Sequence, residues 1–492
     1  MKRSLAINSS DTIAAISTPT GQGGLGIVRI SGPDALRIAD EIFLCKKGLP
    51  SSFPTHTVHH GQVHGGSAFI DNALLIIMHA PRTYTGENTV EISCHGGRIV
   101  LHKTLAAAIG AGARPANPGE FTMRAFLNGK LDLSQAEAVQ QLIAAQNELA
   151  FRVASEQLRG KLHDRIEAIR SQVLDVAAVV EASIDFPEED IEFSPTEELC
   201  ERLTSAREGI ENLLSTFEDG ARIAEGVNVV ITGKTNVGKS TLLNALFEKD
   251  VAIVTPVAGT TRDVLKESLI LQGISLNVFD TAGIRKPRGI VEKEGVKRSK
   301  KAVREADLVL FVLDADAGVS DEDRRIFREI AGKKFIVVVN KIDLVPDVDD
   351  EALASELRGP PPSQPPDRAP SSAAPGGEEA PAREAGSPPR ARTSALKLEG
   401  IEDLKQRITE NVWSGDIPSV DHAIITSVRH RDALRRAGEA LHRALEALRQ
   451  GLSPEFPAVE IREALEALGL ITGETTDEEI LDRIFSKFCI GK

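Results

Sequence analysis

The spacing of apolar residues changes along this chain, and the changes divide it into domains. In the first part, short β-branched runs alternate with helical stretches, as at residues 12–16, 26–30, 73–78 and 89–93. Gly and Pro residues separate these runs, which is typical of short strands joined by turns. Residues 1–125 are therefore predicted to form a compact α+β domain.

From residue 134 to 185 the spacing is helical. Apolar side chains recur at steps of three and four residues, at Ile166, Ile169, Val173, Val176 and Val180. Such a stripe packs against neighbouring helices. Helical spacing returns after residue 428, with leucines seven residues apart at Leu434, Leu441 and Leu448. The two stretches predict one α-helical bundle domain in two halves, residues 126–221 and 401–492, with another domain inserted between them.

The inserted segment opens with a predicted strand, a loop and a helix. The loop from Gly233 to Ser240 reads Gly-Lys-Thr-Asn-Val-Gly-Lys-Ser and follows an apolar run at residues 227–231. In this pattern the glycines let backbone N–H groups curl around phosphates at a helix N-terminus. Lys239 reaches the outer phosphates, and Ser240 offers its hydroxyl to Mg²⁺.

Three further motifs follow in the order that a guanine nucleotide requires. Residues 280–283 read Asp-Thr-Ala-Gly, residues 340–343 read Asn-Lys-Ile-Asp, and residues 393–395 read Thr-Ser-Ala. The carboxylate of Asp343 can accept two hydrogen bonds from the N–H edge of guanine, which adenine lacks. Residues 222–400 are therefore predicted to form an inserted α/β P-loop GTPase domain of the Ras-like type. The expected nucleotide contacts are Asn236, Val237, Gly238, Lys239, Ser240, Thr241, Thr255, Gly259, Thr260, Thr261, Asp280, Thr281, Ala282, Gly283, Asn340, Lys341, Asp343, Ser394, Ala395 and Leu396.

The hydrolytic residues differ from those of Ras. Ile284 stands where Ras-like enzymes place the glutamine that orients the attacking water. Glu292 and Glu294 lie downstream, and either could take that role. The stretch 255–261 is rich in small residues, and its carbonyl groups together with Asn236 could surround a monovalent cation that stabilises charge in place of an arginine.

Composition narrows the class of protein. The chain has 492 residues, a formal net charge of −14 and four cysteines. Its length suffices for about two to four domains, its acidity disfavours nonspecific adhesion to nucleic acid, and its cysteines are too few for a disulfide framework. No long apolar run or signal-peptide pattern appears, so a cytoplasmic protein without a membrane span is expected. Ten of the 25 prolines lie at residues 360–389, and residues 346–392 are predicted to be a disordered insert.

The chain resembles the MnmE (TrmE) family of tRNA-modification GTPases over nearly its full length. The resemblance lies in five stretches: Thr-Ile-Ala-Ala at residues 12–15, residues 23–32, Tyr-Thr-Gly-Glu at 84–87, residues 118–133, and the final Phe-Cys-Ile-Gly-Lys at 488–492. The insertion of a GTPase domain between helical halves is also this family's architecture. The proline-rich insert is longer than is usual for the family.

The resemblance implies a function and its partners. It implies a homodimer, formed through a folate-binding-like N-terminal domain, that works with the FAD-carrying flavoprotein MnmG on the wobble uridine of certain tRNAs. A 5-formyltetrahydrofolate-type folate would supply the one-carbon unit for a carboxymethylaminomethyl-type group. By motif position, Arg29, Glu91, Lys130 and Lys492 would contact the folate, and Cys489 is a possible participant.

The resemblance also assigns the ions and the catalytic residue. It implies K⁺ held by Asn236, Thr255, Val257 and Thr260, and Mg²⁺ held by Ser240 and Thr261. It selects Glu292 as the catalytic residue. Hydrolysis of GTP would then drive the GTPase domains of a dimer together and control the conformation of the enzyme.

Two other classes of protein share part of the pattern. A ribosome-assembly GTPase that binds RNA without modifying it can also carry Asp-Thr-Ala-Gly followed by an apolar residue. Such a protein is expected to have a basic RNA-binding appendage, whereas this chain is acidic and ends in Cys-Ile-Gly-Lys. A folate-binding scaffold with a decayed GTPase is disfavoured because the phosphate and base motifs are intact.

Overall fold

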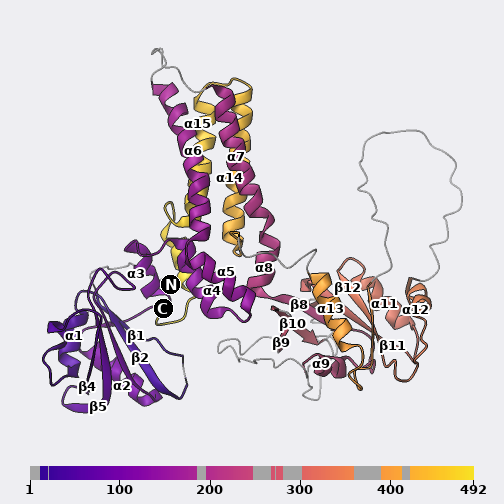
Figure 1. The fold of residues 1–492 in the computed structure, drawn as a ribbon, viewed down its shortest axis with the longest axis horizontal. Coiled ribbons are helices and arrows are strands. Elements are labelled where there is room, and N and C mark those ends of the chain that lie inside the picture. Colours follow the sequence, from indigo (N-terminus) through magenta and orange to yellow (C-terminus); the bar gives the residue numbers. More distant parts are fainter. Residues whose placement is uncertain are drawn as a thin grey trace. The chain divides into compact units, whose positions relative to one another are not determined.

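The protein consists of two compact units, one inserted into the other (Figure 1). The structure is a computed structural model that describes residues 11–19, 21–185, 195–247, 267–271, 273–280, 302–358, 389–412 and 422–492. The first unit comprises Met1–Ala144, Arg152–Phe217 and Asp421–Lys492, and the second comprises Ala145–Phe151 and Glu218–Val420. Each unit is described by itself below.

The first unit begins with a seven-stranded sheet of order β3-β4-β5-β6-β2-β1-β7. Its pairs are antiparallel except for β1 with β7. Alternate residues of each strand face helices α1 and α2, as Leu75 and Ile77 do in the core cluster, so the period-two pattern decides which face is buried. The elements are β1 (Ile13–Ile16), β2 (Gly23–Ser31), α1 (Ala35–Ile42), β3 (Phe43–Leu44), the short 3-10 helix η1 (Pro50–Ser52), β4 (Thr57–Gly65), β5 (Ala68–Met78), β6 (Thr89–Gly96), α2 (Arg98–Gly110) and β7 (Arg114–Pro115). The predicted α+β domain is confirmed.

Helices make up the rest of the first unit. Four long ones lie side by side in Figure 1: α6 (Lys161–Asp185), α7 (Thr196–Ser215), α14 (Val428–Arg449) and α15 (Glu455–Thr472). The apolar stripe predicted on α6 is buried at all five of its positions. The shorter helices are α3 (Glu120–Leu127), α4 (Leu133–Ala144), α5 (Glu148–Leu158), which continues from the second unit, and α16 (Glu478–Phe485). The predicted bundle built from both ends of the chain is confirmed.

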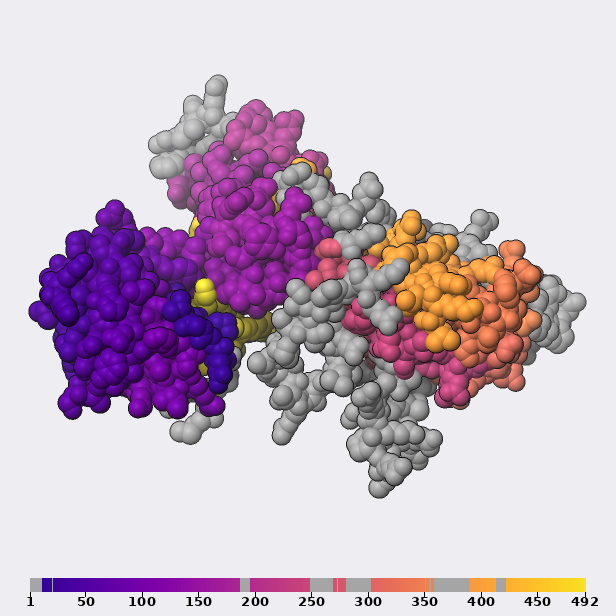
Figure 2. All heavy atoms as spheres, turned by 60° about the horizontal axis from the view of Figure 1, so that its bottom comes forward, coloured from indigo at the N-terminus to yellow at the C-terminus, as the bar shows by residue number. Residues whose placement is uncertain are grey.

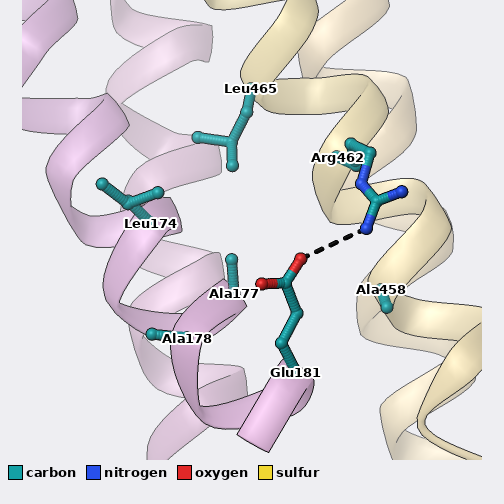
Figure 3. Close-up of a pocket in the computed structure, with 7 residues that line it drawn as sticks. All are labelled: Leu174, Ala177, Ala178, Glu181, Ala458, Arg462 and Leu465. Carbon is teal, nitrogen blue, oxygen red and sulfur yellow. Dashed lines mark hydrogen bonds and ion pairs between the residues drawn. The ribbon is translucent and has the colours of Figure 1, made fainter. Parts of the chain in front are cut away.

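A pocket of about 220 Å³ opens on the bundle between α6 and α15. Figure 3 shows Leu174 and Glu181 on one wall and Arg462 and Leu465 on the other, with an ion pair between Glu181 and Arg462 at 3.2 Å. Alanines complete the walls, so the pocket offers no nucleophile and no group set for catalysis. Among the described helices, none combines the length and apolar content needed to cross a bilayer.

The second unit is built on a six-stranded sheet of order β13-β12-β11-β8-β10-β9. All its pairs are parallel except β9 with β10. β11 is buried at every residue, as expected for a parallel strand covered on both faces. The elements are α8 (Phe217–Glu225), β8 (Val227–Thr232), α9 (Lys239–Phe247), β9 (Glu267–Leu271), β10 (Ile274–Asp280), β11 (Leu308–Asp314), α11 (Asp321–Ile330), β12 (Phe335–Asn340), α12 (Asp350–Arg358), β13 (Arg390–Thr393) and α13 (Ile401–Val412).

Two predicted boundaries of this unit are wrong. The disordered insert expected at 346–392 is too long at both ends, because α12 buries Leu353 and Leu357 in the core and β13 pairs with β12. The boundary expected at residue 400 is too early, because α13 packs against β12 and β13. Helical spacing alone could not show which sheet or bundle α13 would cover. Residues 359–388 lie outside the described part of the chain.

A network of buried charges joins the N-terminal sheet to α3. The guanidinium of Arg124 is almost fully buried and pairs with Asp11 at 2.5 Å, Glu120 at 3.1 Å and Glu87 at 3.2 Å. Arg114 adds a second cation, 2.6 Å from Glu120. Burial alone would raise the pKa of Glu120, but the two guanidinium groups lower it, and the pKa of Asp11 is lowered in the same way. The ionised carboxyls therefore stabilise the fold at neutral pH.

We expect Arg124→Met to lower the free energy of unfolding by about 3–5 kcal/mol at pH 7, because three carboxylates lose a buried partner. Carboxyls with a lowered folded pKa stabilise above the unfolded pKa and lose that effect as the pH falls through the folded pKa. The difference between variant and wild type should therefore shrink below pH ~4.5. Urea titrations at pH 7 and pH 4 measure it.

The matched control for this prediction is Arg37→Met. Arg37 pairs with Asp34 at 3.2 Å, but both side chains are more than half exposed. Such a surface pair contributes about 0–1 kcal/mol. Equal losses of stability in the two variants would contradict the assigned role of the buried network.

Candidate functional site

The loop between β8 and α9 has the backbone of a phosphate cradle. Gly233 and Gly238 have φ of +150° and +94°, and Asn236 between them has φ of +64°. A Cβ at Gly233 would lie 2.4 Å from the carbonyl oxygen of Val312, and one at Gly238 would lie 2.4 Å from the side-chain nitrogen of Asn340. Only glycine fits at these two positions, so the loop can hold its N–H groups close to an anion.

The lysine of the loop is fixed over it. Lys239 is the first residue of α9, and its Nζ donates to the carbonyl oxygens of Gly233 at 2.8 Å and Lys234 at 2.6 Å. A second lysine, Lys234, pairs with Asp323 at 3.3 Å. The positive charge of Lys239 and the N-terminus of α9 thus face the same loop, as phosphate binding requires.

Asn340 links the phosphate loop to the loops that are predicted to bind the base. Its Nδ2 donates to the carbonyl of Val237 at 2.8 Å. Its Oδ1 accepts from the backbone N–H of Ala395 at 3.0 Å and from the hydroxyl of Thr393 at 3.2 Å. Both ends of this buried amide are therefore used, and one side chain sets the spacing of three motifs that were predicted separately.

The next residues complete the base end. Ser394 Oγ donates to Asp343 Oδ1 at 2.7 Å, which orients this carboxylate. Lys341 has φ of +66° and its Nζ lies 2.6 Å from Asp314 Oδ2. Burial alone would raise the pKa of Asp314, but the bond from Lys341 lowers it. Leu396 is 79% exposed, so it can close over a ligand only from the rim of the site.

Of the Asp-Thr-Ala-Gly motif at residues 280–283, the structure describes only the first residue. Asp280 ends β10 opposite Ile231 of β8, directly before the phosphate loop. The side chain of Asp280 is outside the described structure. The other predicted residues of this part lie wholly outside it: Thr255, Val257, Gly259, Thr260, Thr261, Thr281, Ala282, Gly283 and Glu292.

A second candidate site lies in the first unit, on the sheet face opposite α1 and α2. Arg29 on β2 and Glu91 on β6 are directly opposite each other, and Arg29 Nε donates to Glu91 Oε1 at 2.7 Å. Their neighbours Val28 and Ile30 face the core, so period-two alternation turns Arg29 to the other face. The rings of Tyr84 and Phe121 lie 5.8 and 5.6 Å from the Arg29 guanidinium carbon.

The C-terminal tail meets this pair. Arg29 also donates to the carbonyl of Gly491 at 3.4 Å, and Gly491 has φ of +96° with room for no Cβ beside the Ile16 carbonyl. Figure 2 shows the yellow C-terminal residues beside indigo residues of the N-terminal sheet. Burial and then the charge of Arg29 lower the pKa of Lys492, against the opposing effect of Glu91. Two cations and one carboxylate thus share a half-buried place.

The predicted set is brought together only in part. Arg29 and Glu91 are in contact, and Lys492 lies near enough for their charges to shift its pKa. The carbonyl of the exposed Cys489 accepts from the N–H of Gly119 at 3.4 Å and from the N–H of Lys492 at 3.3 Å. Lys130 is not joined to this set by any ion pair among the described residues; its Nζ donates to the carbonyl of Pro81 at 3.0 Å. The rings beside Arg29 were missed as site residues, although Tyr84 and Phe121 stand inside the stretches that carry the family resemblance.

Comparison with known proteins identifies the family. The model of the MnmE helical domain matches residues 133–489, and the model of the GTP-binding protein TrmE N-terminus matches residues 12–130. The tRNA modification GTPase MnmE of Protochlamydia amoebophila is 44% identical over 98% of this chain and 98% of its own. The tRNA modification GTPase MnmE of Bacillus subtilis is 40% identical over 98% of this chain and 100% of its own.

This chain belongs to the MnmE family. Membership confirms the predicted enzyme class, a GTPase, and the predicted combination of an N-terminal domain, a helical domain and a P-loop domain. Among solved structures, Aquifex aeolicus Era bound to GDP and AlF4⁻ is 28% identical, covers 44% of this chain and 66% of its own, and has a TM-score of 0.27. That score is too low to support a conclusion about the arrangement of domains in this MnmE-family chain.

We expect Ser394→Ala to weaken binding of GDP by about tenfold, because a hydrogen bond to a charged group is worth about 1.5–3 kcal/mol and Asp343 would lose its orientation. Discrimination against ADP should fall with it, since the oriented carboxylate is the predicted acceptor for the N–H edge of guanine. Isothermal titration with both nucleotides measures this. Lys397→Ala in the same loop is the control and should bind GDP like the wild type; an unchanged Ser394→Ala would disprove the role.

Proposed function

We propose that this chain is a potassium-activated GTP hydrolase of tRNA wobble-uridine modification. It would act as a cytoplasmic homodimer with the flavoprotein MnmG and install a carboxymethylaminomethyl-type group by using a tetrahydrofolate one-carbon donor. The observation that carries the proposal is the contact of the C-terminal tail, at Gly491, with the Arg29–Glu91 pair, in one unit of a chain whose other unit holds the candidate guanine-nucleotide site. Arg29 and Lys492 are 463 positions apart in sequence and come close only in the fold.

The second candidate site, at Arg29, Glu91 and Lys492, is called the tail site below. Its residues fit a folate. Two cations suit the glutamyl carboxylates of this ligand, and the carboxylate of Glu91 suits an N–H edge such as that of a pterin. The rings of Tyr84 and Phe121 supply flat apolar surface beside Arg29. A bound folate would supply the one-carbon unit, while Arg29, Glu91 and Lys492 would hold and orient it. Lys130 would have to leave the Pro81 carbonyl to join them.

The residues of the guanine site fit a magnesium–nucleotide complex. The cradle at Gly233 and Gly238 excludes side chains from the place of the phosphates, and Ser240 stands on the first turn of α9. Ser240 and Thr261 would hold Mg²⁺, an ion that neutralises charge on the phosphates. Asn236 would hold K⁺ together with Thr255, Val257 and Thr260. Asn236 is exposed in the loop and has a left-handed backbone.

Hydrolysis is assigned to Glu292, which would position the attacking water in place of the glutamine of Ras-like enzymes. Association of two GTPase units around their nucleotides would then control the modification chemistry at the tail site. The acidic net charge of −14 restricts tRNA binding to local patches, which agrees with a division of labour between this chain and a partner.

We expect turnover of GTP by the wild type to rise in K⁺ and not in Na⁺, because Na⁺ is smaller and does not fit the same ring of oxygens. Glu292→Ala should keep its GTP affinity but lose at least a hundredfold in turnover, as expected for a residue acting mainly in the transition state. Phosphate-release assays in each salt measure both effects. Glu294→Ala should keep the K⁺ response; equal rates in the two salts would contradict the proposed ion site.

Nucleoside analysis of tRNA tests the proposed reaction itself. A strain that lacks this protein should lose the modified wobble uridine, and the wild-type chain should restore it. Arg29→Ala should fail to restore it while hydrolysing GTP at the wild-type rate, because Arg29 lies in the other unit from the nucleotide site. Arg37→Ala, on the same N-terminal domain, is the control. Normal tRNA in the deletion strain would favour the RNA-binding assembly GTPase instead.

A further inference from the structure

Helix α5 begins in one compact unit and ends in the other. Its first turn belongs to the segment Ala145–Phe151, which groups with the GTPase unit, and the rest, from Arg152, groups with the first unit. A helix is a hydrogen-bonded rod that rises about 1.5 Å per residue. A displacement of its first turn is therefore carried to its last.

The first turn is fixed by a buried amide. Asn147 Oδ1 accepts from the N–H of Ala150 at 2.7 Å, as an N-cap does, and Asn147 Nδ2 donates to Ser275 Oγ at 2.9 Å. Asn147 and Ser275 are 8% and 4% exposed. Because both groups are buried, neither can exchange this bond for water without cost. The start of α5 thus follows the position of Ser275.

Ser275 lies at the beginning of β10, and Asp280 lies at its end. β10 pairs in parallel with β8 from Leu276 to Asp280, so the strand runs beside the one that leads into the phosphate loop. Gly226 approaches the same end of β10, where a Cβ would lie 2.7 Å from the Ser275 carbonyl. β10 is also paired with β9 on its other edge, and a close-packed interior transmits strain along such a strand. Asn147 therefore contacts one end of the strand whose other end starts the Asp-Thr-Ala-Gly motif.

The last turn of α5 has its own buried contact in the first unit. Gln157, 3% exposed, donates from Nε2 to the carbonyl of Ile424 at 2.7 Å and to Thr426 Oγ1 at 3.5 Å. Residues 424–426 follow closely on the return of the chain into this unit at Asp421. The N–H of Ile425 donates to Thr216 Oγ1 at 3.1 Å, one residue before the chain leaves the unit.

We propose that α5 transmits the nucleotide state of the GTPase unit to the helical unit. The bond between Asn147 and Ser275 is its joint on the nucleotide side, and the bond between Gln157 and Ile424 is its joint on the helical side. Asn147 is thereby a positioning residue that acts through Ser275 and β10. The inference uses guanine-nucleotide binding alone and is independent of the proposed tRNA and folate chemistry.

Hydrogen exchange read by mass spectrometry on the full chain tests this. The wild type with GDP and with a non-hydrolysable GTP analogue should differ in protection at residues 148–158 and at 422–428. In Ser275→Ala that difference should shrink about fivefold, the factor that corresponds to one buried hydrogen bond of about 1 kcal/mol. The affinity for both nucleotides should stay within about twofold of the wild-type value. Asn147→Ala should behave in the same way.

Two further variants separate the joints. Gln157→Leu should keep the nucleotide-dependent difference at residues 148–154 but lose it at 422–428, because only the helical-side joint is removed. Asn277→Ala removes a bond from the same strand to the Glu225 carbonyl, at 3.0 Å, and should leave both differences intact.

Three results would overturn the proposal. The first is a wild type without nucleotide-dependent exchange in α5. The second is a nucleotide-dependent difference in exchange that is fully retained in both Ser275→Ala and Asn147→Ala. The third is a tenfold loss of nucleotide affinity in these two variants. The last result would place the contact in the binding site itself. Circular dichroism melts show that each variant compared is folded, and Asn147→Ala replaces Ser275→Ala should the latter not fold.

Discussion

The first unit depends on polar contacts that close its chain across the inserted unit. One of them is the pairing of Arg429 on α14 with Glu137 on α4, residues 292 positions apart, with Nη2 to Oε2 at 2.7 Å. The fully buried His430 lies 2.7 Å from the same carboxylate. Burial alone would raise the pKa of Glu137, but His430 and Arg429 lower it to about 2. The helical half that is synthesised first thus carries a charge that is satisfied only when the second half arrives.

The two candidate sites bring residues that are distant in sequence together in different ways. In the candidate guanine site, the side-chain amide of Asn340 holds loops of a single sheet together by hydrogen bonds. This site is therefore formed within its own unit. In the tail site, the register comes from a cross-strand pair and from the last residues of the chain, which close over Arg29. The two sites share no residue and belong to different units of the chain.

Much of this could be predicted from the sequence, since local chemistry decides it. The phosphate loop needs glycine where φ is positive, and Asp343 beside Ser394 needs only neighbouring loops of one sheet. The predictions that failed concern features that are set by tertiary packing. Whether α13 covers a sheet or joins a bundle depends on partners far away in sequence, as does the partner of Lys130. The contact of Asn147 with Ser275 could not be predicted from the sequence either, because an asparagine before a helix is typical of an ordinary N-cap.

The anchoring of α12 and β13 on the core of the second unit also has an evolutionary consequence. Leu357 is buried near the end of α12, and β13 is paired with β12 from Arg390 onward, so both rims of the proline-rich stretch are fixed by the sheet. A change in the length of this stretch between homologous chains would therefore leave the buried leucine of α12 and the pairing of β13 in place, so the core of the second unit is compatible with such changes.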